Sequence, residues 1–151
     1  MNSVTNTDKY LEIIRLLQAE DLIDAIGFQA HGFSHNASNA TYLRNLDTLA
    51  STGLPLYATE LDIDGNTDLE HVHGYMNLFP LLWEHPAIQG ITLWGFKPAM
   101  WRGDEGCYLI DETGQERPAM KWFRAYLKDE FVANASISVM SENGATTIDT
   151  L

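Results

Sequence analysis

Three short apolar runs, each flanked by stretches with helical spacing, limit this chain to a narrow class of folds. The runs are 25–31 (AIGFQAH), 56–62 (LYATELD) and 88–95 (IQGITLWG). None shows the alternation of apolar and polar residues that marks a strand with one face in water. The sequence therefore predicts three buried parallel β-strands, which require long crossover connections between them.

Four helices are predicted around these strands. Apolar residues at helical spacing mark the first two: Tyr10, Ile13, Ile14 and Leu17, then Tyr42, Leu43, Leu46 and Leu49. The third opens with a capping-box pattern, Thr67-x-x-Glu70, and Pro80 should bend or end it. The fourth begins at Pro118, a residue suited to the first helical turn. Strands recur about every 30 residues, the length of a βαβ unit, so the chain is predicted to be an α/β protein.

Composition narrows the function classes. The 151 residues fit one domain, and the formal charge of −12 disfavours nucleic acid and anionic membranes as partners. A neutral ligand such as a sugar is indifferent to that charge. No apolar stretch reaches the roughly 20 residues of a membrane span. The single cysteine, Cys107, excludes an internal disulfide, has no metal-ligand spacing and is interpreted as a core residue.

The composition changes near the C-terminus. From Asn134 onward the sequence ASISVMSENGATTIDTL is rich in Ser, Thr and Ala and has no helical period. We therefore expect residues 1–130 to form one domain and residues 131–151 to be a linker or the start of a further β module. This short β-like tail resembles the first strand of a bacterial immunoglobulin-like module.

Polar or aromatic side chains lie near the C-terminal end of all three predicted strands. Residues two apart on a strand share a face, which gives three pairs: Gln29 and His31, Glu60 and Asp62, and Thr92 and Trp94. In parallel α/β folds the active site lies at this edge of the sheet. The carboxylates in an otherwise apolar strand are therefore interpreted as lining a site.

Each histidine and carboxylate also has a structural interpretation. A single Glu at a strand end is often ion-paired, and His31 alone could be a core histidine with satisfied nitrogens. With carboxylates on the adjacent strand, His31 becomes a candidate orienting partner. His71 and His73 suggest a metal pair, but side chains two apart on a helix diverge, so we expect both at the surface.

The tryptophans divide into two groups. Trp83 and Trp122 fall on the apolar faces of predicted helices and are expected in the core. Trp94 ends a strand, and Trp101 lies in the Gly- and charge-rich loop KPAMWRGDEG. Exposed aromatics near carboxylates suit carbohydrate, because the C–H faces of sugar rings stack on them.

Together these runs resemble a known family. The order GFQAH, TELDID, GITLWGF and LIDETGQERPAMKWF, over roughly residues 3–130, resembles the C-terminal half of family 10 glycoside hydrolases, the retaining endo-1,4-β-xylanases. The resemblance implies a partial (β/α)₈ TIM barrel containing about the last three strands and four helices. It implies xylan or xylo-oligosaccharide as the substrate, no metal or cofactor, and a monomer when complete. An extracellular or periplasmic location follows from the polymeric substrate alone.

The resemblance also implies residue roles. The Glu of TELD would be the nucleophile, Glu60, hydrogen-bonded in a chain with the side chains of His31 and Asp62. The implied substrate contacts are Gln29, Trp94 and Trp101. The loop MWRGDEGCY departs from common versions of the family at the last of these positions.

The second carboxyl of a retaining glycosidase is missing from this pattern. The mechanism needs a protonated carboxyl about 5 to 5.5 Å from the nucleophile, and the family supplies it from an Asn-Glu pair closing the fourth strand. An eight-stranded barrel also takes about 250 residues, and three strands would leave open edges. We therefore expect the last part of a barrel, inactive alone, with Met1 an internal start and the N-terminal part absent. The alternatives are a non-catalytic sugar-binding remnant of the same fold and an unrelated small doubly wound domain.

Overall fold

The computed structural model describes residues 1–128, 136–141 and 144–149. They divide between two compact units, one built from residues 1–61 and 78–93 and the other from residues 62–77 and 94–151. The elements are α1 (Val4–Ala19), β1 (Ile26–Phe28), the 3-10 helix η1 (Gly32–Ser34), α2 (Asn39–Ala50), β2 (Leu56–Leu61), α3 (Asp68–Trp83), β3 (Ile88–Leu93), α4 (Pro118–Leu127), β4 (Ser136–Ser141) and β5 (Gly144–Asp149). Up to α4 this is the predicted alternation of helices and strands.

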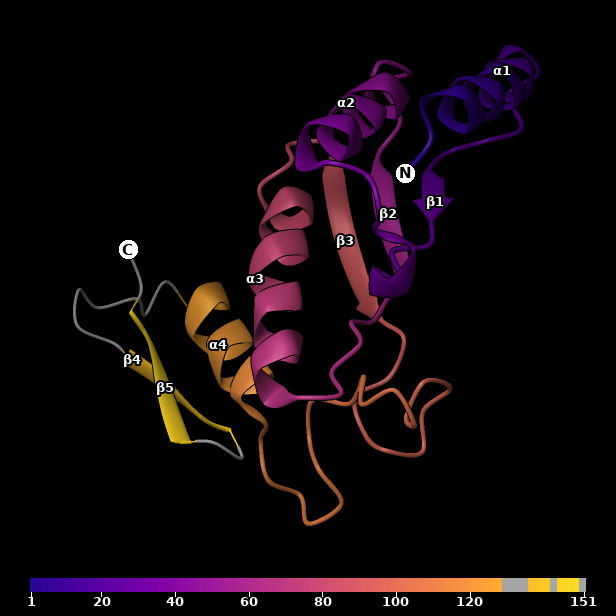
Figure 1. Ribbon diagram of the computed structural model, residues 1–151. Helices are drawn as coiled ribbons and strands as arrows, with labels where there is room; N and C mark the ends of the chain where they lie inside the picture. The colour runs from indigo at the N-terminus through magenta and orange to yellow at the C-terminus, as the bar shows by residue number, and fades with distance from the viewer. Residues whose placement is uncertain (129–135, 142–143, 150–151) are drawn as a thin grey trace. The chain divides into compact units, whose positions relative to one another are not determined.

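The first unit contains a three-stranded sheet in the order β1-β2-β3 (Figure 1). Both pairings are parallel, with Ile26 opposite Leu56 and Leu56 opposite Ile88. The prediction of three parallel strands, adjacent in chain order, is confirmed. Parallel pairing places the carboxyl ends of the strands at one edge of the sheet.

The strands are less buried than their apolar sequences suggested. In β2, Leu56 and Ala58 are fully buried, whereas Tyr57 between them is 39% exposed. The expectation of burial on both faces is therefore wrong for this strand: one face packs in the core, and the face that carries Tyr57 is partly exposed to solvent. Strand β1 also ends at Phe28, three residues before the predicted end at His31.

The outer strands of this sheet are β1 and β3. Tyr10 on α1 donates a hydrogen bond from its hydroxyl to the carbonyl oxygen of Gly27 on β1, at 3.2 Å. This contact links helix α1 to an outer strand of the sheet, whose unpaired backbone groups would otherwise be open.

Side chains cap the N-terminal ends of three helices. The hydroxyls of Ser3 and Ser38 accept backbone N–H bonds at the starts of α1 and α2. At α3 the capping box is confirmed in both directions: Glu70 N–H donates to the Thr67 hydroxyl at 3.2 Å, and Thr67 N–H donates to the Glu70 carboxylate at 3.3 Å. Helix α4 begins at Pro118, as predicted.

The two helix tryptophans differ. Trp122 is 3% exposed and packs in the core, as predicted, whereas Trp83 is 52% exposed. The core expectation for Trp83 is wrong, because α3 continues past Pro80 and places Trp83 as its last residue, where it stacks on Phe79 with ring centroids 5.6 Å apart. A helix end has fewer neighbours to bury an indole than the middle of the helix.

Each unit has its own apolar core. The first is formed mainly by Ile14, Ile26, Leu46, Leu49, Leu56, Leu61 and Phe79, and the second by Ile63, Val72, Tyr75, Cys107, Leu109, Ala119 and Trp122. Burial of Cys107 confirms its prediction as a core residue. Among the described residues, no helix combines the length and apolarity needed to cross a membrane.

The tail forms more strand than expected. Residues 136–141 and 144–149 pair as an antiparallel hairpin, β4 with β5, in a register that sets Ser136 opposite Asp149. The sequence predicted only the start of one strand there. Parts of the predicted segment 131–151, residues 131–135, 142–143 and 150–151, lie outside the described residues, and its assignment as a linker or the start of an immunoglobulin-like module stays a prediction.

Arg117 anchors the loops of the second unit. Its Nε donates to Asp68 at 2.8 Å, and its Nη2 donates to the carbonyl oxygen of Gly65 at 2.8 Å. Its Nη1 donates to the carbonyl oxygens of Tyr108, at 3.0 Å, and Gly106. The side chain is only 11% exposed. One guanidinium therefore ties the segment after β2 to the segment before α4.

We predict that Arg117→Ala lowers the free energy of unfolding by about 3 kcal/mol, because it leaves three carbonyl oxygens and a carboxylate without their donor. Urea unfolding followed by circular dichroism measures the change. The matched control is Arg124→Ala, which removes a half-exposed ion pair with Glu116 and should cost less than about 1 kcal/mol. Equal losses in the two variants would contradict the anchoring role of Arg117.

Candidate functional site

The geometry of the first unit joins two of the predicted site residues. His31 Nε2 lies 3.0 Å from Glu60 Oε2, across 29 positions in the sequence. Their side chains are 5% and 20% exposed, respectively. An ionised carboxylate only accepts hydrogen bonds. When Glu60 is charged, His31 Nε2 therefore carries a hydrogen and donates the hydrogen bond. The result is a charge-assisted hydrogen bond with a partly accessible carboxylate.

The turn that follows β1 holds His31. The hydroxyl of Ser34 donates to the carbonyl oxygen of His31 at 2.8 Å, and the backbone N–H of Ser34 donates to the same oxygen at 3.1 Å. The ring of Phe33 stacks on the imidazole, with centroids 5.3 Å apart and planes at 24°. The backbone and one face of His31 are therefore both constrained.

Asp62 lies two residues beyond Glu60 and is 1% exposed. The pairing of β2 with β3 shifts between Ala58 and Leu61, so strict alternation of side chains does not extend through Glu60. Glu60 is partly accessible, whereas Asp62, which lies just past the end of β2, is buried. The hydrogen-bonded chain from Asp62 to His31 stays a prediction.

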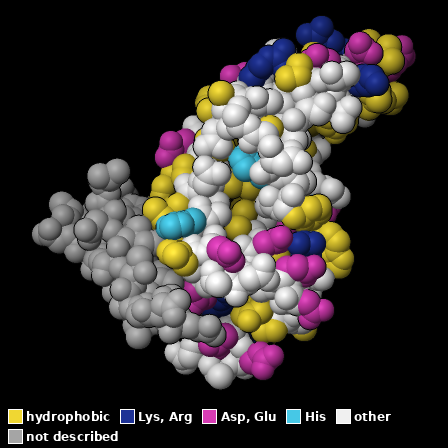
Figure 2. All heavy atoms as spheres, viewed as in Figure 1, with side chains coloured by type: hydrophobic (Ala, Val, Ile, Leu, Met, Phe, Trp, Pro, Cys, Tyr) yellow, Lys and Arg dark blue, Asp and Glu magenta, His cyan; other side chains and the backbone are white. Residues whose placement is uncertain are grey.

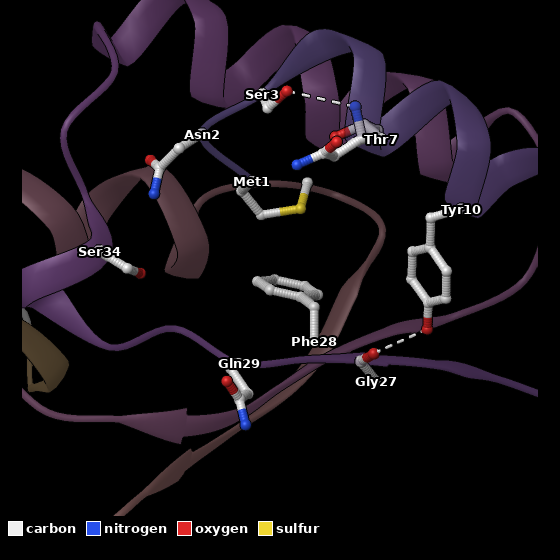
Figure 3. Close-up of a pocket in the computed structure, with 10 residues that line it drawn as sticks. Met1, Asn2, Ser3, Thr7, Tyr10, Gly27, Phe28, Gln29 and Ser34 are labelled. Carbon is white, nitrogen blue, oxygen red and sulfur yellow. Dashed lines mark hydrogen bonds between the residues drawn. The ribbon is translucent and has the colours of Figure 1, made fainter.

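Gln29 is exposed and borders a hollow of about 500 Å³ beside β1. Residues from the first ten positions of the chain, including Met1 and Tyr10, line it together with Phe28 and Ser34. Figure 3 shows the Phe28 ring pointing toward Met1, whereas the Gln29 side chain points the opposite way. The predicted contact of Gln29 with sugar stays a prediction.

Trp94 and Trp101 are 44% and 63% exposed, in the segment between β3 and α4. The guanidinium of Arg102 lies 5.6 Å from the centre of the Trp101 ring, within range of a cation–π contact. Arg102 in turn binds Asp64: its Nε and Nη2 lie 3.2 and 2.8 Å from Oδ1, and its Nη2 lies 3.0 Å from Oδ2. The loop that carries Trp101 is therefore fastened to the segment just after β2.

The Arg102–Asp64 pair was missed by sequence reasoning. Its only signals were Asp64, two residues after the Asp of TELD, and an Arg beside Trp101, and nothing in the sequence joins them. The thiol of Cys107 also donates to Asp64 Oδ1, at 3.3 Å. Burial first, and then this contact with Asp64, raise the pKa of the Cys107 thiol to about 12. At neutral pH the thiol is protonated and unreactive.

The expectation that His71 and His73 both lie at the surface is wrong for His71, which is fully buried, whereas His73 is exposed. The spacing shows that the two side chains diverge, but not which one points inward. His71 packs against Gly65, where an added Cβ would lie 2.5 Å from the imidazole Cγ, and it meets Tyr75 edge-on at 5.2 Å. Among the described residues, no group of three metal-ligating side chains is placed to hold an ion.

The surface agrees with the acidic composition. Figure 2 shows Asp and Glu side chains spread over the visible face, with Lys and Arg in smaller groups. The chain has 21 acidic residues against nine Lys and Arg. Such a surface repels polyanions and leaves neutral ligands unaffected.

Comparison with known proteins places this geometry in a family. Residues 1–126 match the model for glycosyl hydrolase family 10. The chain belongs to that family. Endo-1,4-β-xylanase B of Cellvibrio japonicus is 36% identical over 114 residues, which are 74% of this chain and 18% of that protein. Endo-1,4-β-xylanase 2 of Arabidopsis thaliana is 33% identical over 129 residues, 81% of this chain and 11% of that protein.

Solved structures of family 10 enzymes show the same fold. Native xylanase 10B from Thermotoga maritima superposes with a TM-score of 0.67 at 22% identity, covering 82% of this chain and 43% of that one. Xylanase 10B from Thermotoga petrophila RKU-1, in complex with xylobiose, gives 0.69 at 21% identity, covering 85% and 44%. The three parallel strands and four helices thus correspond to part of the (β/α)₈ barrel, as predicted. The chain spans less than half of these structures and less than a fifth of the two curated relatives.

Burial of His71 generates a prediction about pH. Desolvation, and next the charge of Arg117, lower the pKa of His71 from 6.5 to about 4 in the folded chain. The unfolded chain binds the His71 proton more tightly than the folded chain does. The contribution of neutral His71 to the free energy of unfolding is therefore fully present above pH 6.5 and decreases by about 3 kcal/mol in all as the pH falls toward 4. Urea unfolding at several pH values between 7 and 4 measures this slope.

The matched variants are His71→Gln and His73→Gln. Removing the buried imidazole should flatten the fall in unfolding free energy over this pH range, whereas removing the exposed one should leave it unchanged. The explanation fails if His71→Gln keeps the full slope.

Proposed function

We propose that this chain carries the nucleophile portion of a retaining endo-1,4-β-xylanase, with Glu60 as the nucleophile. The observation that carries this proposal is the 3.0 Å hydrogen bond between His31 Nε2 and Glu60 Oε2 near the carboxyl ends of neighbouring parallel strands. Family membership supports the reaction class. The bound xylobiose named for the Thermotoga petrophila enzyme, and the xylohexaose named for a Clostridium thermocellum xylanase, support xylan as the substrate.

The chemistry follows from that hydrogen bond. His31 engages Oε2, which leaves Oε1 of Glu60 free to attack the anomeric carbon of a xylose residue. A bond forms from Oε1 to that carbon while the bond to the glycosidic oxygen breaks, and the leaving oxygen takes a proton from a second carboxyl group. Water then cleaves the glycosyl ester, with the second carboxylate accepting its proton, and Glu60 is restored.

The resemblance to the family implies roles for the other predicted residues. In the proposed hydrogen-bonded chain, Asp62 would accept a hydrogen bond from the His31 imidazole, which would hold the Glu60 carboxylate in one rotamer. The exposed rings of Trp94 and Trp101 offer stacking surfaces for sugar, with Trp101 held by Arg102. Gln29 would contribute a hydrogen-bonding amide near the end of β1.

We further propose that the acid/base carboxyl comes from outside these 151 residues. The Asn-Glu pair that supplies it in the family has no counterpart at a strand end in this sequence. The chain alone is then inactive on xylan, and pairing with the N-terminal part of a barrel restores activity. A polymeric plant substrate would place the complete enzyme outside the cell or in the periplasm.

The alternative is a non-catalytic carbohydrate-binding remnant of the same fold. The observation that favours it is the combination of the exposed Trp101 with the missing Asn-Glu pair. Such a protein would bind xylo-oligosaccharides without forming a covalent bond to Glu60.

The test is covalent trapping with 2,4-dinitrophenyl 2-deoxy-2-fluoro-β-xylobioside, whose leaving group needs no acid catalyst. We expect the intact mass to increase by one fluoroxylobiosyl group, located on Glu60 by peptide mapping. Glu60→Gln should slow labelling at least about a thousandfold, because an amide is a poor nucleophile.

Glu70→Gln is the matched control, since glutamine preserves the capping box and the exposed position has no role in the reaction. It should label at the wild-type rate. Label on another residue contradicts the assignment of Glu60, and binding of xylobiose without any label favours the carbohydrate-binding alternative.

A further inference from the structure

A phenylalanine lies half in water beside the proposed nucleophile pair. Phe33 belongs to the 3-10 helix η1, directly after His31, and is 50% exposed. Such a position gives little burial of apolar area, so packing alone gives a weak reason for a large ring there. The ring stacks on the imidazole of His31, with centroids 5.3 Å apart and planes 24° from parallel.

The stack adds to two other contacts of His31. The backbone of His31 is held through its carbonyl oxygen by Ser34, and its Nε2 is engaged by Glu60. Rotation of the imidazole about its side-chain torsions would break the bond to Glu60 without disturbing the backbone. A flat ring against one face of the imidazole opposes that rotation and keeps water from that face.

We propose that Phe33 is a positioning residue that holds the His31 imidazole in the plane from which Nε2 reaches Glu60. Phe33 acts through His31 rather than on the reacting atoms. The geometric part of this inference stands on the structure alone, and its consequence for glycosyl transfer rests on the proposed function. An aromatic pair contributes about 0.5–1.5 kcal/mol, which corresponds to roughly a three- to tenfold effect on a rate or an equilibrium.

The geometric part is tested by NMR on the complete chain labelled with ¹⁵N-histidine. The signal of the His31 Nε2–H proton, assigned by its absence in His31→Gln, reports the hydrogen bond to Glu60. Phe33→Ala should speed its exchange with water by roughly three- to tenfold or broaden it beyond detection. Phe33→Tyr keeps a flat ring and should preserve the signal, as should Trp83→Ala, which removes another half-exposed, stacked ring.

The functional part uses the rate of labelling by the fluoroxylobioside. Phe33→Ala should lower the maximal labelling rate roughly three- to tenfold with the apparent affinity for the sugar unchanged, and Phe33→Tyr should restore it. Circular dichroism confirms that each variant is folded.

The outcomes separate this proposal from the proposed function. An unchanged Nε2–H signal in Phe33→Ala overturns the proposal, and so does an effect confined to the apparent affinity, which would make Phe33 a sugar contact. If the wild-type chain takes up no label, the proposed function fails, and the NMR result still decides whether Phe33 positions His31.

Discussion

Parallel pairing of three strands is the constraint on which the site depends. Because β1, β2 and β3 run the same way in chain order, their carboxyl ends meet at one edge without any further device. This alignment brings His31, at the exit of β1, to within 3.0 Å of Glu60, near the end of β2. The sheet brings the two residues close together, and the hydrogen bond between them orients their side chains. The turn containing Ser34 and Phe33 further constrains His31.

In the second unit, two arginine side chains hold segments distant in sequence together, as strand pairing does in the first. Residues 62–67 and 94–117 lie outside the named helices and strands, and Arg102 and Arg117 donate hydrogen bonds to carboxylates and carbonyl oxygens there. Their side chains are only 15% and 11% exposed. In a chain with nine basic residues, two are used internally to fix loops. A planar fork of donors suits this task better than a lysine ammonium.

The sequence predicted the elements well because hydrophobic spacing is a local property. The three strands, the start of α4 at Pro118 and the capping box at Thr67 all follow from near neighbours in the chain. The misplaced residues depend on tertiary context. Divergence of His71 and His73 was foreseeable, but the inward side was not. The exposure of Trp83 depends on where a proline-containing helix stops. The Arg102–Asp64 pair joins loops 38 positions apart, which no spacing rule connects.

The sole cysteine gives the second unit an internal reporter. Its thiol is 1% exposed and lies against Asp64, whose carboxylate also binds Arg102. A sulfhydryl so enclosed reacts with an alkylating reagent only when the surrounding segment opens. The alkylation rate of unmodified protein therefore measures how often the Trp101 loop detaches, without any engineered label.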